Sequence, residues 1–181
     1  MERQQGQNER SLAWFKLADL IARGEREKAL SVFRLLSHSL TDKAYVLQIE
    51  GDILWFMDSS ASIEKYNQAA FLYQKEKRWI EAIAIQEHLL TMRPNACDAL
   101  AILLVLYALV DWPEKFDSRF TMLVHLYNEH VLDNLQLDKA LQLLVDALQD
   151  QAAKPWLMTW FANVYESLPA SVVATLQPFL R

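Results

Sequence analysis

Apolar residues recur along almost the whole chain at the spacing of an α-helix, and short polar breaks interrupt them. Residues 1–10 lack this pattern and are predicted to form a polar N-terminal tail. Helices joined by such short connections must fold back as antiparallel hairpins, so the predicted fold class is all-α. The predicted helices lie near residues 11–23, 25–39, 41–57, 60–75, 78–91, 95–110, 113–130, 135–149, 154–166 and 169–180.

The breaks contain residues that favour helix ends. Gly24 can adopt positive φ at little cost, which suits the end of the first helix. Prolines at positions 113, 155 and 169 stand where a helix can begin. The candidate N-caps, whose side chains would accept hydrogen bonds from unpaired amides, are Thr41, Ser59, Ser60, Ser62 and Asn95.

Some positions repeat at a shift of 34 residues, such as Tyr73 with Tyr107 and Leu89 with Leu123. Within 66–94, small residues stand where two helices would approach closely, and aromatic residues fill the spaces beside them. The positions concerned are Tyr66, Ala69, Ala70, Tyr73, Ala82, Leu89 and Pro94. This segment resembles one unit of the tetratricopeptide-repeat superfamily.

The resemblance covers residues 11–130 and is strongest over 66–94. It implies a right-handed superhelical stack of helix hairpins (an α-solenoid), with 131–181 as a C-terminal helical cap of the same domain. Helix 60–75 fits two phases of the repeat. It matches both the partner of helix 41–57 and the first helix of the following unit.

Composition excludes several classes of protein. The chain has 3 glycines and 5 prolines in 181 residues, too few for the many tight turns of a β-sandwich. Its net charge is −5 and it has no large basic cluster, so a nucleic-acid partner is disfavoured. The most apolar run, 99–110, is too short to cross a membrane, and residues 1–10 do not form a secretory signal. We therefore expect a soluble, cytoplasmic protein without a membrane span.

No pattern indicates catalysis or a cofactor. The four histidines are scattered, and no glycine-rich phosphate loop or metal-ligand spacing is present. We expect no metal site, no cofactor and no enzymatic activity. Cys97 follows Asn95 at a predicted helix start, where the helix dipole could lower the thiol pKa. A small buried apolar residue is the alternative interpretation of Cys97.

The resemblance implies a concave groove lined by the first helix of each hairpin. Large aromatic residues there would anchor a partner, although packing between helices is an equal alternative for them. The groove residues implied are Phe15, Asp19, Arg23, Gln48, Asp52, Trp55, Phe56, Asn67, Phe71 and Lys75. Phe15 and Asp19 occupy positions that hold a carboxylate clamp in some family members, so binding of a peptide C-terminus by such a clamp is not expected.

Trp156 and Trp160 are four residues apart and therefore lie on one face of a helix. This face could either close the end of the stack or join two copies of the chain. The main hypothesis is an adaptor or scaffold that binds a peptide or helix of another protein in its groove. The alternatives are a dedicated chaperone of the type III secretion kind, a self-assembling structural subunit, and a helical domain that binds a small ligand or acts as an enzyme.

Overall fold

The structure is a computed structural model, and it describes residues 2–149, 155–164, 166 and 168–176. All helices and turns described here belong to those residues, in which ten α-helices and no strand are present. None of these helices is long and apolar enough to cross a membrane. The chain divides into two compact units, Met1–Lys77 and Arg78–Arg181. This division falls inside the segment 66–94, so the best-matching repeat is shared between the units.

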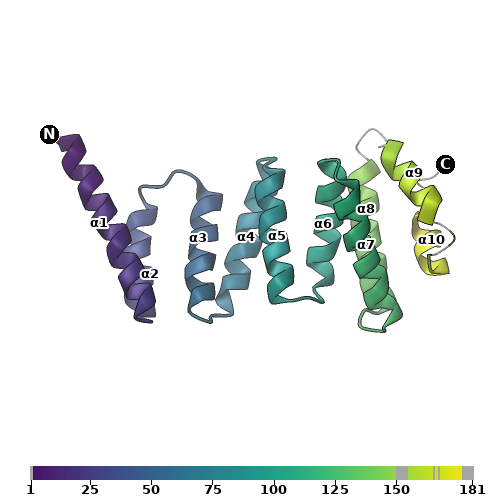
Figure 1. Cartoon of the computed structure of the whole chain (residues 1–181), viewed down its shortest axis with the longest axis horizontal. Coiled ribbons are helices and arrows are strands. Elements are labelled where there is room, and N and C mark those ends of the chain that lie inside the picture. The colour runs from purple at the N-terminus through teal and green to yellow at the C-terminus, as the bar shows by residue number, and fades with distance from the viewer. Residues whose placement is uncertain (1, 150–154, 165, 167, 177–181) are drawn as a thin grey trace. The chain divides into compact units, whose positions relative to one another are not determined.

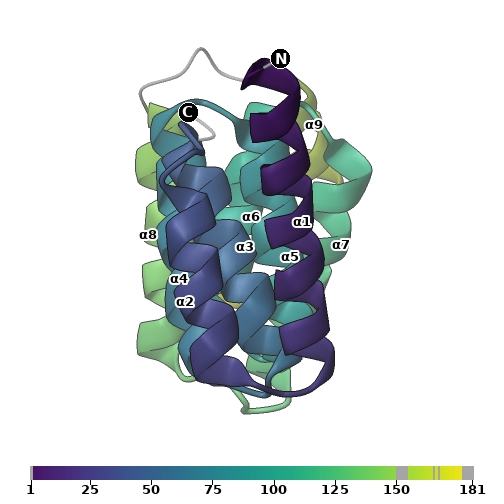
Figure 2. The ribbon, with the colours of Figure 1, turned by 90° about the vertical axis from the view of Figure 1, so that its left-hand side faces the viewer.

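Unit 1 is an up-and-down arrangement of four helices (Figure 1). They are α1 (Glu2–Ala22), α2 (Arg26–Ser37), α3 (Lys43–Phe56) and α4 (Ala61–Lys75). The α1–α2 hairpin lies nearest the viewer in Figure 2. The core of unit 1 is one buried apolar cluster. It contains Leu17 and Leu20 of α1, Phe33 of α2, and Ile53 and Leu54 of α3.

Unit 2 is organised around α6 (Cys97–Leu109), which packs against α5 (Trp79–Met92), α7 (Pro113–Asn128) and α8 (Asn134–Gln149). Most of α6 is buried, as expected for an apolar helix surrounded by neighbours. Helix α9 (Pro155–Val164) packs on α7, and α10 (Ala170–Leu176) packs on α8. The all-α prediction is confirmed, and each predicted helix is present.

The starts of three helices differ from prediction. Helix α1 begins at Glu2, because the Gln, Glu and Arg residues of 2–10 favour a helix without needing an apolar face. Asp42, rather than Thr41, caps α3 by accepting a hydrogen bond from the Tyr45 amide at 2.9 Å. The N-cap position of α6 is Ala96, so Asn95 is not its cap. The caps predicted at 41 and 95 were therefore wrong by one residue each.

Five helices are followed, two positions after their last residue, by a residue with positive φ, and only Gly24 among these residues is a glycine. The others are Asp58, Lys77, Asp111 and His130. Positions 24 and 58 are 34 apart, as are positions 77 and 111. After four of these residues, the next amide donates to the carbonyl five residues earlier, as from Glu25 to Leu20 at 3.0 Å, which is the Schellman helix ending. The spacing between successive turns of this kind therefore alternates between 34 and 19 residues.

These turns explain why helix 60–75 fitted two phases. Helix α4 follows the positive-φ turn at Asp58 and precedes the one at Lys77, so a tight connection borders it on both sides. Within unit 1 its partner is α3, and α3 and α4 form the closest helix pair of the unit. Among the connections whose residues are all described, 38–42 and 129–133 are the longest, at five residues each.

The close packing of α3 and α4 depends on Gly51. A Cβ atom at this position would lie 2.9 Å from Cδ1 and Cε1 of the Tyr66 ring. Tyr66 is only 1% exposed, so its ring has little room to move. The absence of a side chain at Gly51 allows the ring to rest directly on the α3 backbone.

We predict that Gly51→Ala destabilises the protein. Helix propensity alone would add about 1 kcal/mol of stability. Overpacking against Tyr66 reverses the sign, giving a net loss of about 1–3 kcal/mol in the free energy of unfolding, measured by urea denaturation. The same substitution in a Tyr66→Leu background should cost clearly less, because the ring is gone. An equal cost in both backgrounds would show that the clash is not responsible.

A second prediction concerns the positive-φ turns. Nothing lies within 4 Å of a Cβ added at Gly24, so Gly24→Ala tests backbone conformation alone. Gly24→Ala should lower the free energy of unfolding by about 1 kcal/mol, and Lys77→Gly should raise it by about 0.5–1 kcal/mol. Thermal and urea unfolding measure both. Changes of the same sign in the two variants would contradict the assignment.

Candidate functional site

Hydrogen bonds between α3 and α4 fix the two edges of their contact. The Tyr66 hydroxyl donates to Oδ1 of Asp52 at 2.7 Å, and the Tyr73 hydroxyl donates to Oε1 of Gln48 at 2.8 Å. Both tyrosine side chains are buried. On the other edge of the hairpin, Nζ of Lys65 pairs with Oε2 of Glu50 at 3.1 Å.

Helical spacing places a strip of side chains along each helix. On α3, positions 45, 48, 52 and 56 are separated by three or four residues and share one side. On α4, positions 67, 71 and 74 share the side that faces away from Lys65. Because Lys65 marks one edge of the hairpin, both strips lie at the opposite edge, where Gln48 and Asp52 accept hydrogen bonds. We call this surface the α3–α4 face: Tyr45, Gln48, Asp52, Trp55, Phe56, Asn67, Phe71 and Gln74.

Large aromatic side chains are exposed on the α3–α4 face. Phe56 is 66% exposed and Phe71 is 65% exposed, while Tyr45 and Trp55 are each 45% exposed. The interior of the hairpin is filled instead by Tyr66 and Tyr73. Single exposed apolar residues are common in soluble proteins, but several large aromatic residues on one hairpin face are typical of a contact surface.

The polar groups of this face are held by the buried tyrosines. Burial raises the pKa of Tyr66 well above its usual value, and the hydrogen bond to Asp52 and the Asp52 charge raise it further. The phenol therefore stays protonated and keeps donating to the carboxylate. Sequence reasoning placed Gln48 and Asp52 in the groove but missed these hydrogen bonds, because their partners lie on another helix.

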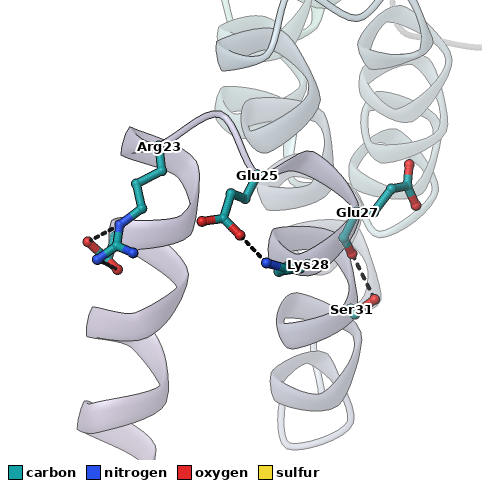
Figure 3. A network of polar contacts seen from close by, with 6 residues as sticks. Arg23, Glu25, Glu27, Lys28 and Ser31 are labelled. Carbon is teal, nitrogen blue, oxygen red and sulfur yellow. Dashed lines mark hydrogen bonds and ion pairs between the residues drawn. The ribbon is translucent and has the colours of Figure 1, made fainter.

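The predicted groove residues of α1 lie on its exposed surface. Phe15 is 75% exposed. Arg23, the residue after the end of α1, pairs with Asp19 of that helix, with Nη2 and Oδ2 2.8 Å apart. Figure 3 shows Arg23 near a second local pair of the α1–α2 connection, in which Lys28 binds Glu25 at 2.5 Å. Asp19 and Arg23, both predicted groove residues, are thus paired with each other.

Lys75, the remaining predicted groove residue, is the last residue of α4 and is exposed. It follows Phe71 by four residues and so lies beside it, on the side of Phe71 away from Gln74. It is therefore at the margin of the α3–α4 face. Of the ten predicted groove residues, the structure brings six onto this one face: Gln48, Asp52, Trp55, Phe56, Asn67 and Phe71.

Trp156 and Trp160 pack α9 onto α7. The indole N–H of Trp156 donates to Asp111 at 2.9 Å, and that of Trp160 donates to Asp117 at 2.7 Å. The Trp160 ring meets Phe116 and Phe120 edge-on, with ring centroids 4.9 and 4.8 Å apart. The two tryptophans thus pack against other residues of unit 2. This packing is what the first of the two predicted roles, closing the end of the helix stack, requires.

A partly buried polar cluster joins three helices of unit 2. The Glu87 carboxylate on α5 accepts a hydrogen bond from Tyr107 on α6 and binds the Arg119 guanidinium on α7 through both oxygens. Burial alone would raise the Glu87 pKa, but the Arg119 and Tyr107 hydrogen bonds and the Arg119 charge lower it overall. The pKa of Tyr107 is raised, chiefly by burial. Because the Glu87 carboxylate binds Tyr107 and Arg119 at once, it links α5 to both α6 and α7.

Cys97 borders a cavity of about 580 Å³ between α6 and α8. Its thiol contacts the Gln136 carbonyl oxygen at 3.5 Å. Burial raises the thiol pKa, and the negative charges of Asp98 and Asp133 raise it further. The raised pKa therefore argues against a thiol activated by the helix dipole. Among the described residues, no group of three or more His, Cys, Asp or Glu side chains is placed to hold a metal ion.

No protein-family model matches the sequence, and no similar protein is found among curated proteins.

The Glu87 cluster gives a prediction with a defined pH dependence. Arg119→Met should lower the free energy of unfolding by about 1–3 kcal/mol at pH 7, because it leaves a partly buried carboxylate without its main partner. The Glu87 pKa is lowered in the folded protein, so this stabilisation is complete above the unfolded value near 4.5 and is lost as the pH falls through the folded value.

Urea denaturation of the wild type and Arg119→Met at pH 7 and at pH 3.5 measures this difference. Arg23→Met is the matched control, because Arg23 pairs with Asp19 on an exposed surface and such pairs contribute little. A difference between wild type and Arg119→Met that is as large at pH 3.5 as at pH 7 would contradict the role of the Glu87 charge.

Proposed function

We propose that the chain is a non-enzymatic adaptor or scaffold that binds a peptide or helix of another protein. The observation that supports this most directly is the α3–α4 face, where four aromatic side chains are at least 45% exposed beside polar groups held by buried tyrosines. Aromatic side chains contribute most of the affinity in many protein interfaces. Fixed polar groups favour specificity, because they need not lose further conformational freedom on binding.

The resemblance of 66–94 to a tetratricopeptide unit supports the same class of function. In that family the stacked hairpins present a surface to a partner, and the proposal includes a superhelical stack of this kind. The proposed location is the cytoplasm. The single cysteine supports it, because a chain with one cysteine forms no internal disulfide.

The proposal is tested by capture of partners from a native lysate. The wild type is compared with Phe56→Ala plus Phe71→Ala, which removes the two most exposed aromatic side chains of the face. The control is Leu35→Ala plus Leu135→Ala, two residues of α2 and α8 that are 74% and 62% exposed. We expect the aromatic variant to lose about tenfold or more of the captured partner, and the control to retain it.

Circular dichroism establishes that both variants are folded. If the folded aromatic variant captures the same partners in the same amounts as the wild type, the α3–α4 face is not the binding surface. A separate Phe15→Ala variant shows whether the exposed side of α1 contributes to the same partner.

A further inference from the structure

Asp52 lies at the centre of the aromatic strip of α3. Tyr45 precedes it by two helical turns and Phe56 follows it by one, so all three share one side of the helix. Asn67 of α4 lies opposite, because the neighbouring Tyr66 donates to the Asp52 carboxylate. The carboxylate therefore lies on a helix side that also carries exposed aromatic residues, with the Asn67 amide on the neighbouring helix.

The Asp52 carboxylate is fixed in place but still accessible. The buried Tyr66 hydroxyl holds its Oδ1 at 2.7 Å, while the Asp52 side chain is exposed. Asp52 forms no salt bridge with any residue that the structure describes. The lysine of the same hairpin, Lys65, is paired with Glu50 at the other edge. The surface thus presents the negative charge of Asp52 on a side chain whose conformational freedom the Tyr66 hydrogen bond already reduces.

A guanidinium group fits this combination better than other ligands. Arginine can donate two parallel hydrogen bonds to a carboxylate, and its flat face stacks on aromatic rings. A lysine ammonium satisfies the charge but has no flat face, and an anionic partner would be repelled. The apolar surface of Phe56 and Phe71 requires that apolar side chains accompany the arginine, as they do on an amphipathic helix.

We propose that the α3–α4 face binds an amphipathic helix of a partner protein and that Asp52 accepts an arginine of that helix, with the Phe56 ring, one helical turn away, contacting the guanidinium. This inference rests on the proposed function, since it specifies the partner of the same face. It adds a requirement for arginine that the lysate experiment does not examine.

The test uses two labelled amphipathic peptides of about 18 residues, a length that forms a stable helix more readily than shorter ones. One carries leucines along one side with arginines beside them, and the other carries citrulline at each arginine position. Citrulline keeps the shape of arginine and removes the charge. Fluorescence anisotropy measures both affinities for the full chain in the same buffer.

We expect the arginine peptide to bind the wild type about tenfold more tightly than the citrulline peptide, as for a charge-assisted contact beside an aromatic ring. Asp52→Asn keeps an acceptor for Tyr66 and should reduce this ratio to about two or less. Asp138→Asn, an exposed residue of α8, changes the net charge equally and should leave the ratio unchanged. Tyr66→Phe keeps the ring against Gly51 and should lower the ratio partway, because the carboxylate is no longer fixed.

Each other outcome overturns the inference. If both peptides bind equally and Phe56→Ala plus Phe71→Ala abolishes both, the face binds helices but does not select arginine, and the proposed function stands. If Asp138→Asn lowers the ratio as much as Asp52→Asn, only overall charge matters. If neither peptide binds at millimolar concentration, the face does not take an arginine-bearing helix, and the lysate experiment decides the proposed function separately.

Discussion

The contact between Gly51 and the ring of Tyr66 determines how unit 1 is built. Because Gly51 has no side chain, the ring lies against the α3 backbone, and α3 and α4 approach closely. At this separation the hydroxyls of Tyr66 and Tyr73 reach across to Asp52 and Gln48. One missing Cβ atom therefore fixes the helix pair, and the helix pair fixes the polar groups of the candidate binding surface.

In unit 2, as in unit 1, a buried tyrosine hydroxyl needs a hydrogen-bond acceptor, and here the acceptor is part of an ion pair. Tyr107 buries its ring in the most enclosed helix of the unit, and its hydroxyl still needs a partner. Glu87 supplies the acceptor, and Arg119 balances the charge that this carboxylate brings into a partly buried position. In both units a tyrosine fills the space between helices and fixes a polar side chain of a neighbour. The difference is that Asp52 keeps an exposed charge, whereas Glu87 is neutralised.

The helices could be predicted because they depend on local interactions. The helix ends, the Glu87 cluster and the boundary between the units depend on non-local contacts and could not be predicted. Helix positions followed from apolar spacing, because that spacing depends only on residues within a few turns. Positive φ at Lys77 and Asp111 could not be predicted from residue type, since those helices end where packing requires. The Glu87 cluster left no signal, because its partners lie on separate helices at unrelated spacings. The boundary between the compact units after Lys77 could not be predicted either, because it lies inside segment 66–94, which resembles a single repeat unit.

The candidate surface shows why a prediction with an unresolved repeat phase still selected residues that lie on one face of a hairpin. The sequence analysis treated α3 and α4 each as the first helix of a repeat unit. On both helices the groove residues were chosen at the same number of residues from a small, closely packed residue, which is Gly51 on α3 and Ala70 on α4. In an antiparallel hairpin, equal offsets on the two helices point to the same side of the pair. Asp52 and Phe56 of α3 therefore meet Asn67 and Phe71 of α4 on one face, with the Lys65–Glu50 pair on the other edge. The face is consequently a property of one hairpin, and it exists whichever phase the rest of the chain follows.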